Sequence, residues 1–192
     1  MARIEPLTGR NAPLWLKALN FMSRRMIGKE VTQVGILGRT PGLLLPLAMT
    51  SRLVSGKSQV DQRTRSLATE LAAHLNGCGW CMDFGRATAR RQGVPAAKLD
   101  ALEEHATSPL FSPSERAALS LAEAITRDVH VVDDDVWAEA RRHFSERELI
   151  ELVVAVAMET FYNRLNSALG IESQGFCELP SLAGAARQRQ AV

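Results

Sequence analysis

The chain has 192 residues, of which 46% are hydrophobic and 23% charged, so it is long enough for one domain with a sizeable core. Its net charge of +2 gives no strong electrostatic attraction to nucleic acid. Pro6, Gly9 and Pro13 interrupt the N-terminal apolar residues, so no secretory signal is predicted. The apolar run at 41–54 is too short to cross a bilayer. We therefore expect a soluble cytoplasmic protein that binds neither nucleic acid nor membrane.

Apolar residues recur at helical spacing almost throughout the chain, and no segment alternates convincingly with a period of two. This pattern predicts an all-α fold of about seven or eight helices. In the first half we expect helices at 13–26, from 41 onward, at 60–76, and from 78 or 79 to 92. The helix at 60–76 should present Leu67, Leu71 and Leu75 as one apolar stripe, and Gly77 suits the left-handed position that ends it. Pro46 should bend or delay the second of these helices, and residues 28–38 are expected to form a flexible connector.

The second half of the chain contains two capping boxes, each of which predicts a helix start. Ser112 and Glu115 open a helix that ends near residue 127, and Ser145 and Glu148 open the longest apolar helix, which Gly170 ends. Shorter helices are predicted at 95–104 and 133–143. We divide the chain into an N-terminal helical extension at 1–59, a helical core at 60–170 and a C-terminal tail at 171–192, which should fray from residue 181.

The sequence Asn-Gly-Cys-Gly-Trp-Cys at 76–81 places Cys78 and Cys81 three positions apart at the start of a predicted helix. Side chains at this spacing share one helix face, so the two thiols can close a disulfide without large backbone movement. The free N–H groups and positive dipole of a helix start favour a thiolate. Gly79 leaves room for a substrate or partner sulfur, and Trp80 should form an apolar rim. The motif therefore predicts a redox site.

The Cys pair has three other interpretations: a zinc site, a haem attachment site and two structural cysteines. A structural zinc site normally takes four ligands, and Cys177 and the four dispersed histidines form no second close pair. Met82 stands where covalent haem attachment needs His. Two buried structural cysteines are a further alternative, because Cys often packs as a small apolar residue. We predict neither a metal nor a cofactor.

The thiols need a proton acceptor, and the preceding helix offers two candidates. Glu70 and His74 are four residues apart on one face, which continues toward Cys78 another four residues on. A Glu-to-His-to-Cys relay is therefore geometrically available. The alternative is a satisfied, half-buried His74 with Glu70 in an ordinary surface pair. Asp83, in the first turn of the motif helix, is a better helix-dipole partner than a base.

The arrangement of helix, Asn-Gly-Cys-x-x-Cys and helix in an all-helical chain resembles the carboxymuconolactone decarboxylase superfamily, and specifically its alkyl hydroperoxidase D-like (AhpD-like) branch. The resemblance extends from about residue 61 to 168 and includes 112–124, Glu148-Leu149 and 163–166. It implies a compact helical bundle that assembles into homo-oligomers. In the peroxidase members of the family, the Cys pair reduces peroxides or relays electrons to a partner peroxiredoxin.

Two positions depart from the family pattern, which has a Glu twelve residues before the first Cys and a His four residues after the second. Here these positions are Ser66 and Gly85, so the thiols are retained while the family's proton relay is absent. Trp80 also stands where the family often carries His. Glu70 lies one helical turn from Ser66 on the same face, so we expect it to reach the site from a shifted position.

The resemblance implies a cofactor-independent thiol peroxidase or disulfide reductase, with a peroxide substrate and a thiol or dithiol electron-donor protein as partner. By the same resemblance Cys81 attacks the peroxide and Cys78 resolves, although the opposite assignment stays open. One alternative function is a non-enzymatic, redox-sensing helical oligomer. Another is a lyase of the carboxymuconolactone decarboxylase type.

Overall fold

The computed structural model describes residues 2–128 and 130–179. All regular secondary structure within these residues is helical, which confirms the predicted all-α fold. The elements are, in chain order, η1 (Gly9–Asn11), α1 (Leu14–Ile27), α2 (Thr32–Leu37), α3 (Pro41–Ser55), α4 (Gln62–Leu75), α5 (Gly79–Arg91), α6 (Ala96–Asp100), α7 (Pro113–Arg127), α8 (Asp134–His143), α9 (Glu146–Leu169) and η2 (Phe176–Glu178). None of the described helices is long and apolar enough to cross a membrane.

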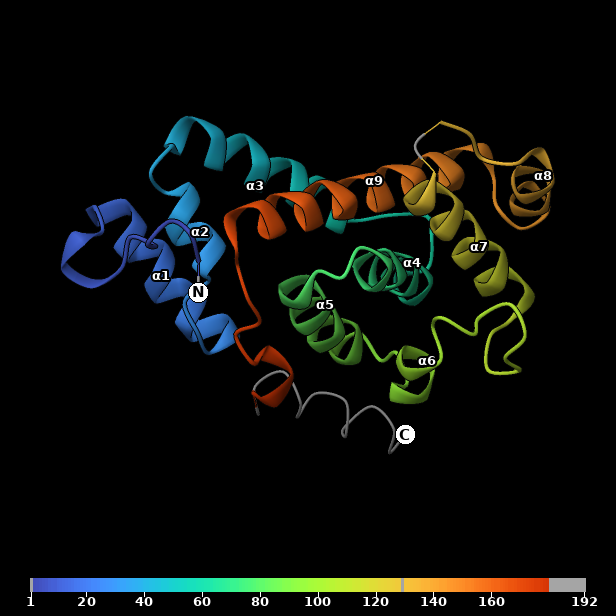
Figure 1. The fold of residues 1–192 in the computed structure, drawn as a ribbon, viewed down its shortest axis with the longest axis horizontal. Helices are drawn as coiled ribbons and strands as arrows, with labels where there is room; N and C mark the ends of the chain where they lie inside the picture. Colours follow the sequence, from blue (N-terminus) through green and yellow to red (C-terminus); the bar gives the residue numbers. More distant parts are fainter. Residues whose placement is uncertain (1, 129, 180–192) are drawn as a thin grey trace.

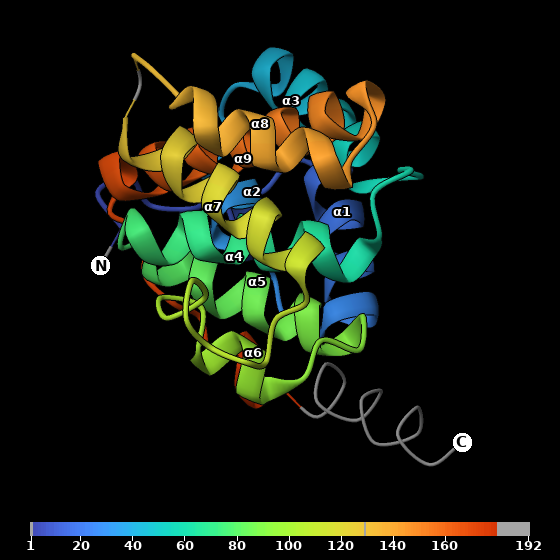
Figure 2. The ribbon, with the colours of Figure 1, turned by 90° about the vertical axis from the view of Figure 1, so that its right-hand side faces the viewer.

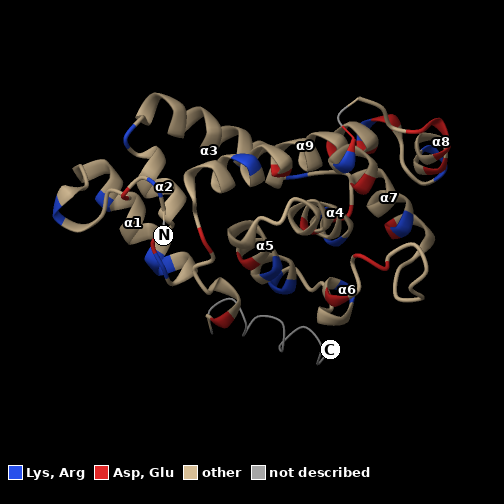
Figure 3. Cartoon of the chain, viewed as in Figure 1, with Lys and Arg blue, Asp and Glu red and all other residues tan. Residues whose placement is uncertain are grey.

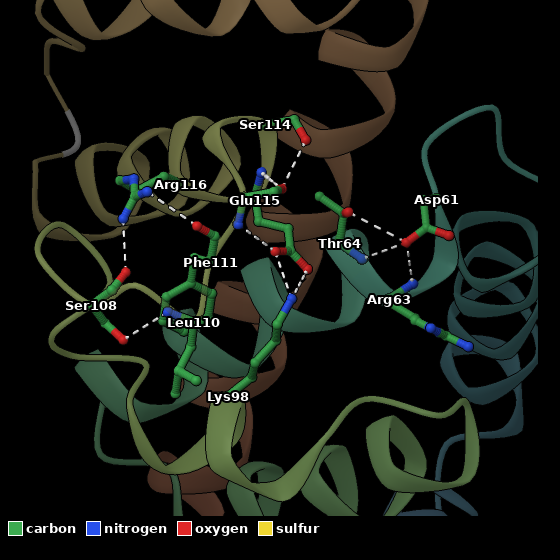
Figure 4. Close-up of polar contacts among 11 residues, drawn as sticks. Asp61, Arg63, Thr64, Lys98, Ser108, Leu110, Phe111, Ser114, Glu115 and Arg116 are labelled. Atoms are coloured by element: carbon green, nitrogen blue, oxygen red, sulfur yellow. Dashed lines mark hydrogen bonds and ion pairs between the residues drawn. The ribbon is translucent and has the colours of Figure 1, made fainter. Parts of the chain in front are cut away.

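Helix α4 lies at the centre of the bundle and contacts α5, α7 and α9. Figure 1 shows it nearly end-on, with α9 above and α5 below, and Figure 2 shows it along its length. The Asp61 side chain accepts hydrogen bonds from the N–H groups of Arg63 and Thr64, at 3.0 Å each, and so caps its first turn (Figure 4). Leu67 and Leu71, both 1% exposed, form the apolar stripe that the sequence predicts.

Both predicted capping boxes are present, and they fix where α7 and α9 begin. In each box the serine hydroxyl accepts from the glutamate N–H, and the glutamate carboxylate accepts from the serine N–H: Ser112 with Glu115, and Ser145 with Glu148. Glu115 also accepts from Lys98 at 2.6 Å, which ties α6 to the start of α7 (Figure 4). Local polar contacts therefore set these boundaries as the sequence indicates.

The N-terminal extension is more helical than predicted. The segment 28–38 is not a simple connector, because it contains α2. A Cβ at Gly35 would lie 2.8 Å from Cβ of Pro6, so a glycine allows the N-terminal segment to pack closely on this helix. Pro46 does not delay α3, which begins at Pro41 and continues through it. Helix α6 is shorter than the predicted 95–104, since residues 101–107 form turns.

Helix α3 is anchored to the core at its C-terminal end. The guanidinium of Arg65, on α4, donates to the carbonyl oxygens of Val54, Ser55 and Gly56 at 3.0, 3.1 and 3.3 Å. The last carbonyls of a helix have no partner within the helix, so this buried cation satisfies them. The N-terminal extension is thereby held in place against α4 and α9.

Helix α3 is apolar on two opposite faces. Its inner face packs toward α9 through Leu44 and Leu47, whereas its outer apolar face, Leu45, Met49 and Leu53, is 59%, 66% and 77% exposed. Helix α1 likewise exposes Leu14, Phe21, Met22 and Met26. In Figure 3, charges gather on α8 and near the ends of α7 and α9, while α3 carries the single charge of Arg52. A bare apolar surface of this kind is typical of a contact site.

The division into extension, core and tail stays a prediction. Residues 171–179 pack against α5, and the N–H of Arg3 donates to the carbonyl of Leu169 at 2.9 Å, so the first described residues close on the end of α9. The fraying predicted from residue 181 lies outside the described residues.

Candidate functional site

The Cys pair sits where α4 turns into α5. Gly77 has φ of +64°, the left-handed conformation that the sequence predicts, and the N–H of Cys78 bonds to the carbonyl of Ala73 at 3.1 Å. Cys78 is the N-cap of α5, and its sulfur accepts from the N–H of Cys81 at 3.3 Å. The two cysteines are joined by a disulfide, with Cα atoms 5.3 Å apart. The i, i+3 spacing therefore does bring the thiols together.

An asparagine from α9 lies against the disulfide. The Nδ2 amide of Asn166, a residue with no exposed surface, is 3.3 Å from Sγ of Cys81 and 4.0 Å from Sγ of Cys78. Its Oδ1 accepts from Nε2 of Gln33 on α2 at 2.9 Å, which fixes the orientation of the amide. When the pair is reduced, an N–H donor at this distance favours the Cys81 thiolate over the thiol. Sequence reasoning identified neither Asn166 nor Gln33 as a site residue.

A cavity of about 410 Å³ opens beside Cys81. It is predominantly apolar: α2 and α3 form one wall, and α5 and α9 form the other, with Trp80, Phe84 and Gly85 beside the sulfur. The hydroxyl of Tyr162 closes one side by donating to the carbonyl of Leu47 at 3.2 Å. The size is typical of a small-molecule site. Cys81 lines the cavity and Cys78 does not, so the two thiols differ in access.

Trp80 lines this cavity, as predicted, and is held by the C-terminal segment. Its ring stacks on Phe84 with centroids 5.1 Å apart, and Phe176 meets both rings edge-on. Its Nε1 donates to Oε1 of Gln174 at 2.9 Å. Gly79 is exposed, and a Cβ there would meet nothing within 4 Å. The room predicted at Gly79 thus lies on the surface beside Cys78, not among the residues that line the cavity.

Asp83 anchors the C-terminal segment. Its carboxylate accepts from the N–H groups of Gln174, Phe176 and Cys177 at 2.9–3.0 Å, and from the hydroxyl of Ser173 at 2.8 Å. Burial opposes its ionisation, but these four donors together hold the pKa of Asp83 below its usual range. The sequence predicts Asp83 as a helix-dipole partner in the first turn of α5, with proton relay or support of the thiols as its alternative role, but the first turn of this helix contains no acidic residue. The bonds of Asp83 instead go to the segment that covers α5.

Cys177 is partly buried and packs against the apolar cluster around Trp80 and Cys81. Its thiol donates to the carbonyl of Asp83 at 3.1 Å. Burial, followed by the negative charge of Asp83, raises the pKa of the Cys177 thiol, which disfavours the reactive thiolate. The described residues contain no group of three or more His, Cys, Asp or Glu side chains that could hold a metal ion.

Glu70 is buried and points at position 85. The residue is only 2% exposed, so the alternative of an ordinary surface pair is wrong for it. A Cβ at Gly85 would overlap Oε2 of Glu70, so the carboxylate occupies the space that a side chain at 85 would need. Its Oε1 lies 3.6 Å from Nε2 of His74. The carboxylate therefore stands where the family pattern places its His.

Burial raises the pKa of Glu70, although the adjacent His74 works in the opposite direction. Interaction with the Glu70 carboxylate raises the pKa of His74 despite that residue's own partial burial. The His74 side chain is 26% exposed and also lies 4.0 Å from Glu103. His74 thus contacts Glu70 on the side that is nearer to solvent. Of the two predicted relay residues, Glu70 is the one whose carboxylate lies against Gly85, where the family has its His.

A second, smaller cavity adjoins the first. It measures about 160 Å³ and is lined by Ser66, the other position that departs from the family pattern. The hydroxyl of Ser66 contacts Oε1 of Gln92. The two cavities share Ser51, Ser55, Glu159 and Tyr162 as lining residues. Ser66 and Cys81 therefore line different cavities, which meet at side chains of α3 and α9.

Glu159 is a site residue that sequence reasoning missed. Its Oε1 accepts from Nδ2 of Asn163 at 2.6 Å, and Oδ1 of Asn163 accepts from Nδ2 of Asn76 at 2.9 Å. Burial, with a smaller contribution from the nearby Glu70 carboxylate, raises the pKa of Glu159 to about 7 against the lowering effect of the Asn163 bond. Glu159, Asn163 and Asn166 follow an i, i+4, i+7 stripe in the C-terminal half of α9, and this stripe was the available signal.

Comparison with known proteins agrees with this geometry. The model of the carboxymuconolactone decarboxylase family matches residues 45–124, which include α4, the Cys pair and α5. The uncharacterized protein YnjA of Escherichia coli K12 is 31% identical over 169 residues, covering 88% of this chain and 93% of that protein. The chain belongs to the carboxymuconolactone decarboxylase superfamily.

Solved structures show that this superfamily member has the AhpD-like fold. An uncharacterized peroxidase-related protein with an alkylhydroperoxidase AhpD core, from Ralstonia eutropha JMP134, superposes with a TM-score of 0.79 at 16% identity, covering 91% of this chain and 94% of that one. The debrominase Bmp8 superposes with a TM-score of 0.79 at 22% identity, covering 95% and 97%. The predicted superfamily and fold are thus confirmed.

Replacement of two glycines that lie within helices, Gly42 and Gly85, by alanine should separate local helix propensity from packing at the site. Gly42→Ala in α3 meets nothing within 4 Å, so it should stabilise the protein by up to about 1 kcal/mol. Gly85→Ala must displace the buried Glu70 carboxylate, and we expect it to be about 1 kcal/mol less favourable than Gly42→Ala. Urea unfolding of both variants, repeated in a Glu70→Ala background, measures this. An equal effect of Gly85→Ala in both backgrounds would contradict the placement of Glu70.

The raised pKa of Glu159 should make folding stability depend on pH. The folded state keeps a proton up to about pH 7 that the unfolded state releases near 4.5, so Glu159 lowers stability progressively as the pH rises through that window. Glu159→Gln removes this loss. Relative to wild type it should gain up to about 3 kcal/mol between pH 4 and pH 8 in urea unfolding of the oxidised protein. The exposed Glu146→Gln, on the same helix, serves as control, and a gain of the same size there would refute the assignment.

Proposed function

We propose that this protein is an AhpD-like, thiol-dependent peroxidase or disulfide reductase in which Cys81 attacks and Cys78 resolves. The observation that carries this proposal is the unequal access of the two thiols: both belong to one disulfide, but Cys81 alone of the pair lines the apolar cavity. A peroxide in that cavity meets Cys81 first. Cys78 then lies within reach to form the disulfide.

The reaction is balanced by the two thiols and an external dithiol. The Cys81 thiolate attacks the terminal oxygen of a hydroperoxide, which gives a sulfenic acid and, after protonation, an alcohol. The Cys78 thiol displaces water from the sulfenic acid and closes the disulfide. A dithiol donor then reduces the disulfide by thiol exchange. The open surface at Gly79, beside Cys78, gives such a donor a route of approach.

Thiolate formation is supported from two directions. The N–H groups at the start of α5 and the Asn166 amide, 3.3 Å from Sγ of Cys81, both favour negative charge on that sulfur. We propose that Glu70, with His74 behind it, gives further support from position 85. Its carboxylate is adjacent to α5 but makes its closest ionic contact with His74, so we assign it a positioning role.

The cavity also favours a second candidate, reductive removal of a halogen from a small apolar ring. In that reaction a carbon–halogen bond is replaced by carbon–hydrogen, halide leaves, and the Cys pair supplies two electrons on becoming a disulfide. An apolar cavity with a carboxyl group beside a thiol suits this chemistry. The structural similarity to the debrominase Bmp8 is in keeping with it.

Single Cys→Ser variants test the proposed peroxidase. With cumene hydroperoxide and dithiothreitol the wild type should consume peroxide catalytically, and both variants should lose turnover. After peroxide, mass spectrometry should detect a sulfenic acid on Cys81 in Cys78→Ser and none on Cys78 in Cys81→Ser. Cys177→Ser is the matched control and should keep wild-type turnover.

The alternatives give different results in the same experiment. A reversible disulfide without peroxide or halide turnover would indicate a redox-sensing oligomer. Conversion of a lactone acid that survives loss of both thiols would indicate a decarboxylase-type lyase. Halide release from a brominated pyrrole, without peroxide consumption, would favour the second candidate.

We further propose that the protein works in the cytoplasm as a homo-oligomer in which a second copy covers the outer apolar face of α3. A helix that is apolar on two opposite faces is most stable when both faces are buried, and the outer apolar face of α3 is exposed in the single chain. The inner side of the same helix lines the cavity beside Cys81 through Leu44 and Leu47. Assembly would therefore fix the position of α3, which forms one wall of the cavity beside Cys81.

Introduction of negative charge on this apolar face should dissociate the assembly. Met49→Glu combined with Leu53→Glu places two carboxylates on the outer apolar face, where burial against a second copy would be strongly unfavourable. Size-exclusion chromatography with light scattering should show the wild type as an oligomer and the double variant as a monomer. Lys57→Glu, in the exposed loop after α3, should leave the mass unchanged. A monomeric wild type would refute this proposal.

A further inference from the structure

Ser66 and Gly85, which stand where the family has its Glu and its His, line two cavities that share one carboxyl group. Gly85 lines the larger cavity together with Cys81, and Ser66 lines the smaller one. Glu159 belongs to the walls of both cavities, so it adjoins the space beside each position that lacks the family's acid or base. Neither Ser66 nor Gly85 can transfer a proton near neutral pH. A titratable group from another helix is nevertheless present at the same place.

The surroundings of Glu159 hold its carboxyl group in one orientation. Asn163, one turn further along α9, donates to Oε1 at 2.6 Å and is itself fixed by Asn76 at the end of α4. This chain of amides leads directly to the turn that contains the Cys motif, because Asn76 precedes Cys78 by two residues. A carboxyl group held through such bonds needs little reorganisation during a reaction.

The charges that face Glu159 come from the helices packed against it. Glu70 on α4 raises its pKa, and Arg65, also on α4, lines the smaller cavity with it. Helix α5 presents Cys81, α9 presents Tyr162, and α3 presents hydroxyl groups without charge. Burial and the neighbouring carboxylate thus bring the pKa of Glu159 to about 7, where a group both accepts and releases protons readily.

We propose that Glu159 is the proton-transfer residue of the Cys81 site, in place of the two relay residues that this chain lacks. The assignment rests on the proposed thiol chemistry and adds the group that would serve it. Because the residue comes from α9, more than 70 positions after the motif, it provides the same chemical function from a different helix.

The proposed step conserves atoms and charge. The Glu159 carboxylate first takes the proton of the Cys81 thiol, which gives a thiolate and a carboxylic acid. The thiolate attacks the terminal oxygen of a hydroperoxide, the O–O bond breaks, and the departing alkoxide takes the proton from Glu159. The products are a Cys81 sulfenic acid, an alcohol and the Glu159 carboxylate. Water forms when Cys78 closes the disulfide, and the dithiol donor supplies the two electrons that complete the cycle.

Glu159→Gln tests this assignment, because the amide keeps the size of the side chain and can still accept from Asn163. Cumene hydroperoxide turnover with dithiothreitol at pH 7 should fall about 100-fold, since general acid–base assistance typically contributes that much or more. The pH–rate profile should lose its inflection near neutral pH. Glu146→Gln, on the same helix but 86% exposed, should keep both the rate and the profile. Glu159→Asp should retain the inflection at a reduced rate.

A second measurement separates this inference from the peroxidase proposal. In the Cys78→Ser background, with Cys177 also replaced by Ser, alkylation of the Cys81 thiol by iodoacetamide is followed against pH without any peroxide. The step near neutral pH should be present with Glu159 and absent with Glu159→Gln. If wild type turns over no peroxide yet shows this difference, the peroxidase proposal fails and the role of Glu159 stands. If Glu159→Gln leaves the alkylation profile unchanged, or if peroxide turnover is measurable and unaffected by it, Glu159 is not the proton-transfer residue.

Discussion

The structure depends on the need to satisfy polar side chains that α9 carries into an apolar bundle. An amide buried without a hydrogen-bond partner costs about 1–3 kcal/mol, so each of these groups constrains its neighbours. Asn166 is satisfied by Gln33 of α2 and lies against the Cys81 sulfur, while Asn163 joins Glu159 to Asn76. The N-terminal extension, the turn before α5 and the disulfide are therefore positioned by one stripe of one helix.

Two carboxyl groups with raised pKa values lie close enough to influence each other beneath the cavity. Glu70 fits because position 85 has no side chain, and Glu159 fits because Asn163 holds it. Burial destabilises the ionised form of both, so the fold is less stable near neutral pH than an apolar core would be. Such costs are typical of functional sites, where carboxyl groups are brought toward neutral pKa values for proton transfer.

Helix α3 links the cavity to the surface of the molecule. Its inner residues form a wall beside Cys81, and its outer residues Leu45, Met49 and Leu53 are bare. Arg65 fixes one end of the helix and Tyr162 contacts its middle. If the proposed oligomer forms through the outer face, the same helix would contact both the second copy and the cavity, which would couple assembly to access at the thiol.

The sequence by itself determined the features that arise from contacts between near neighbours. The capping boxes, the left-handed glycine at 77 and the placement of Cys78 and Cys81 at a helix start depend on residues within about one turn, and the structure has them as predicted. Helical periodicity also sufficed for the all-α fold. The spacing of a regular helix also places Glu70 on the face toward α5, where its carboxylate lies against Gly85.

Only the tertiary structure decided which distant residues meet the thiols. Asn166 lies 85 positions from Cys81 in the sequence. The segment that donates hydrogen bonds to the Asp83 carboxylate begins 90 positions after Asp83. Polar residues on α9 resemble surface residues until the partners that bury them are known, and α2 is too short for its apolar pattern to predict a helix. The sequence shows that position 85 has no side chain. Only the packing of α4 against α5 shows that the resulting space holds the Glu70 carboxylate.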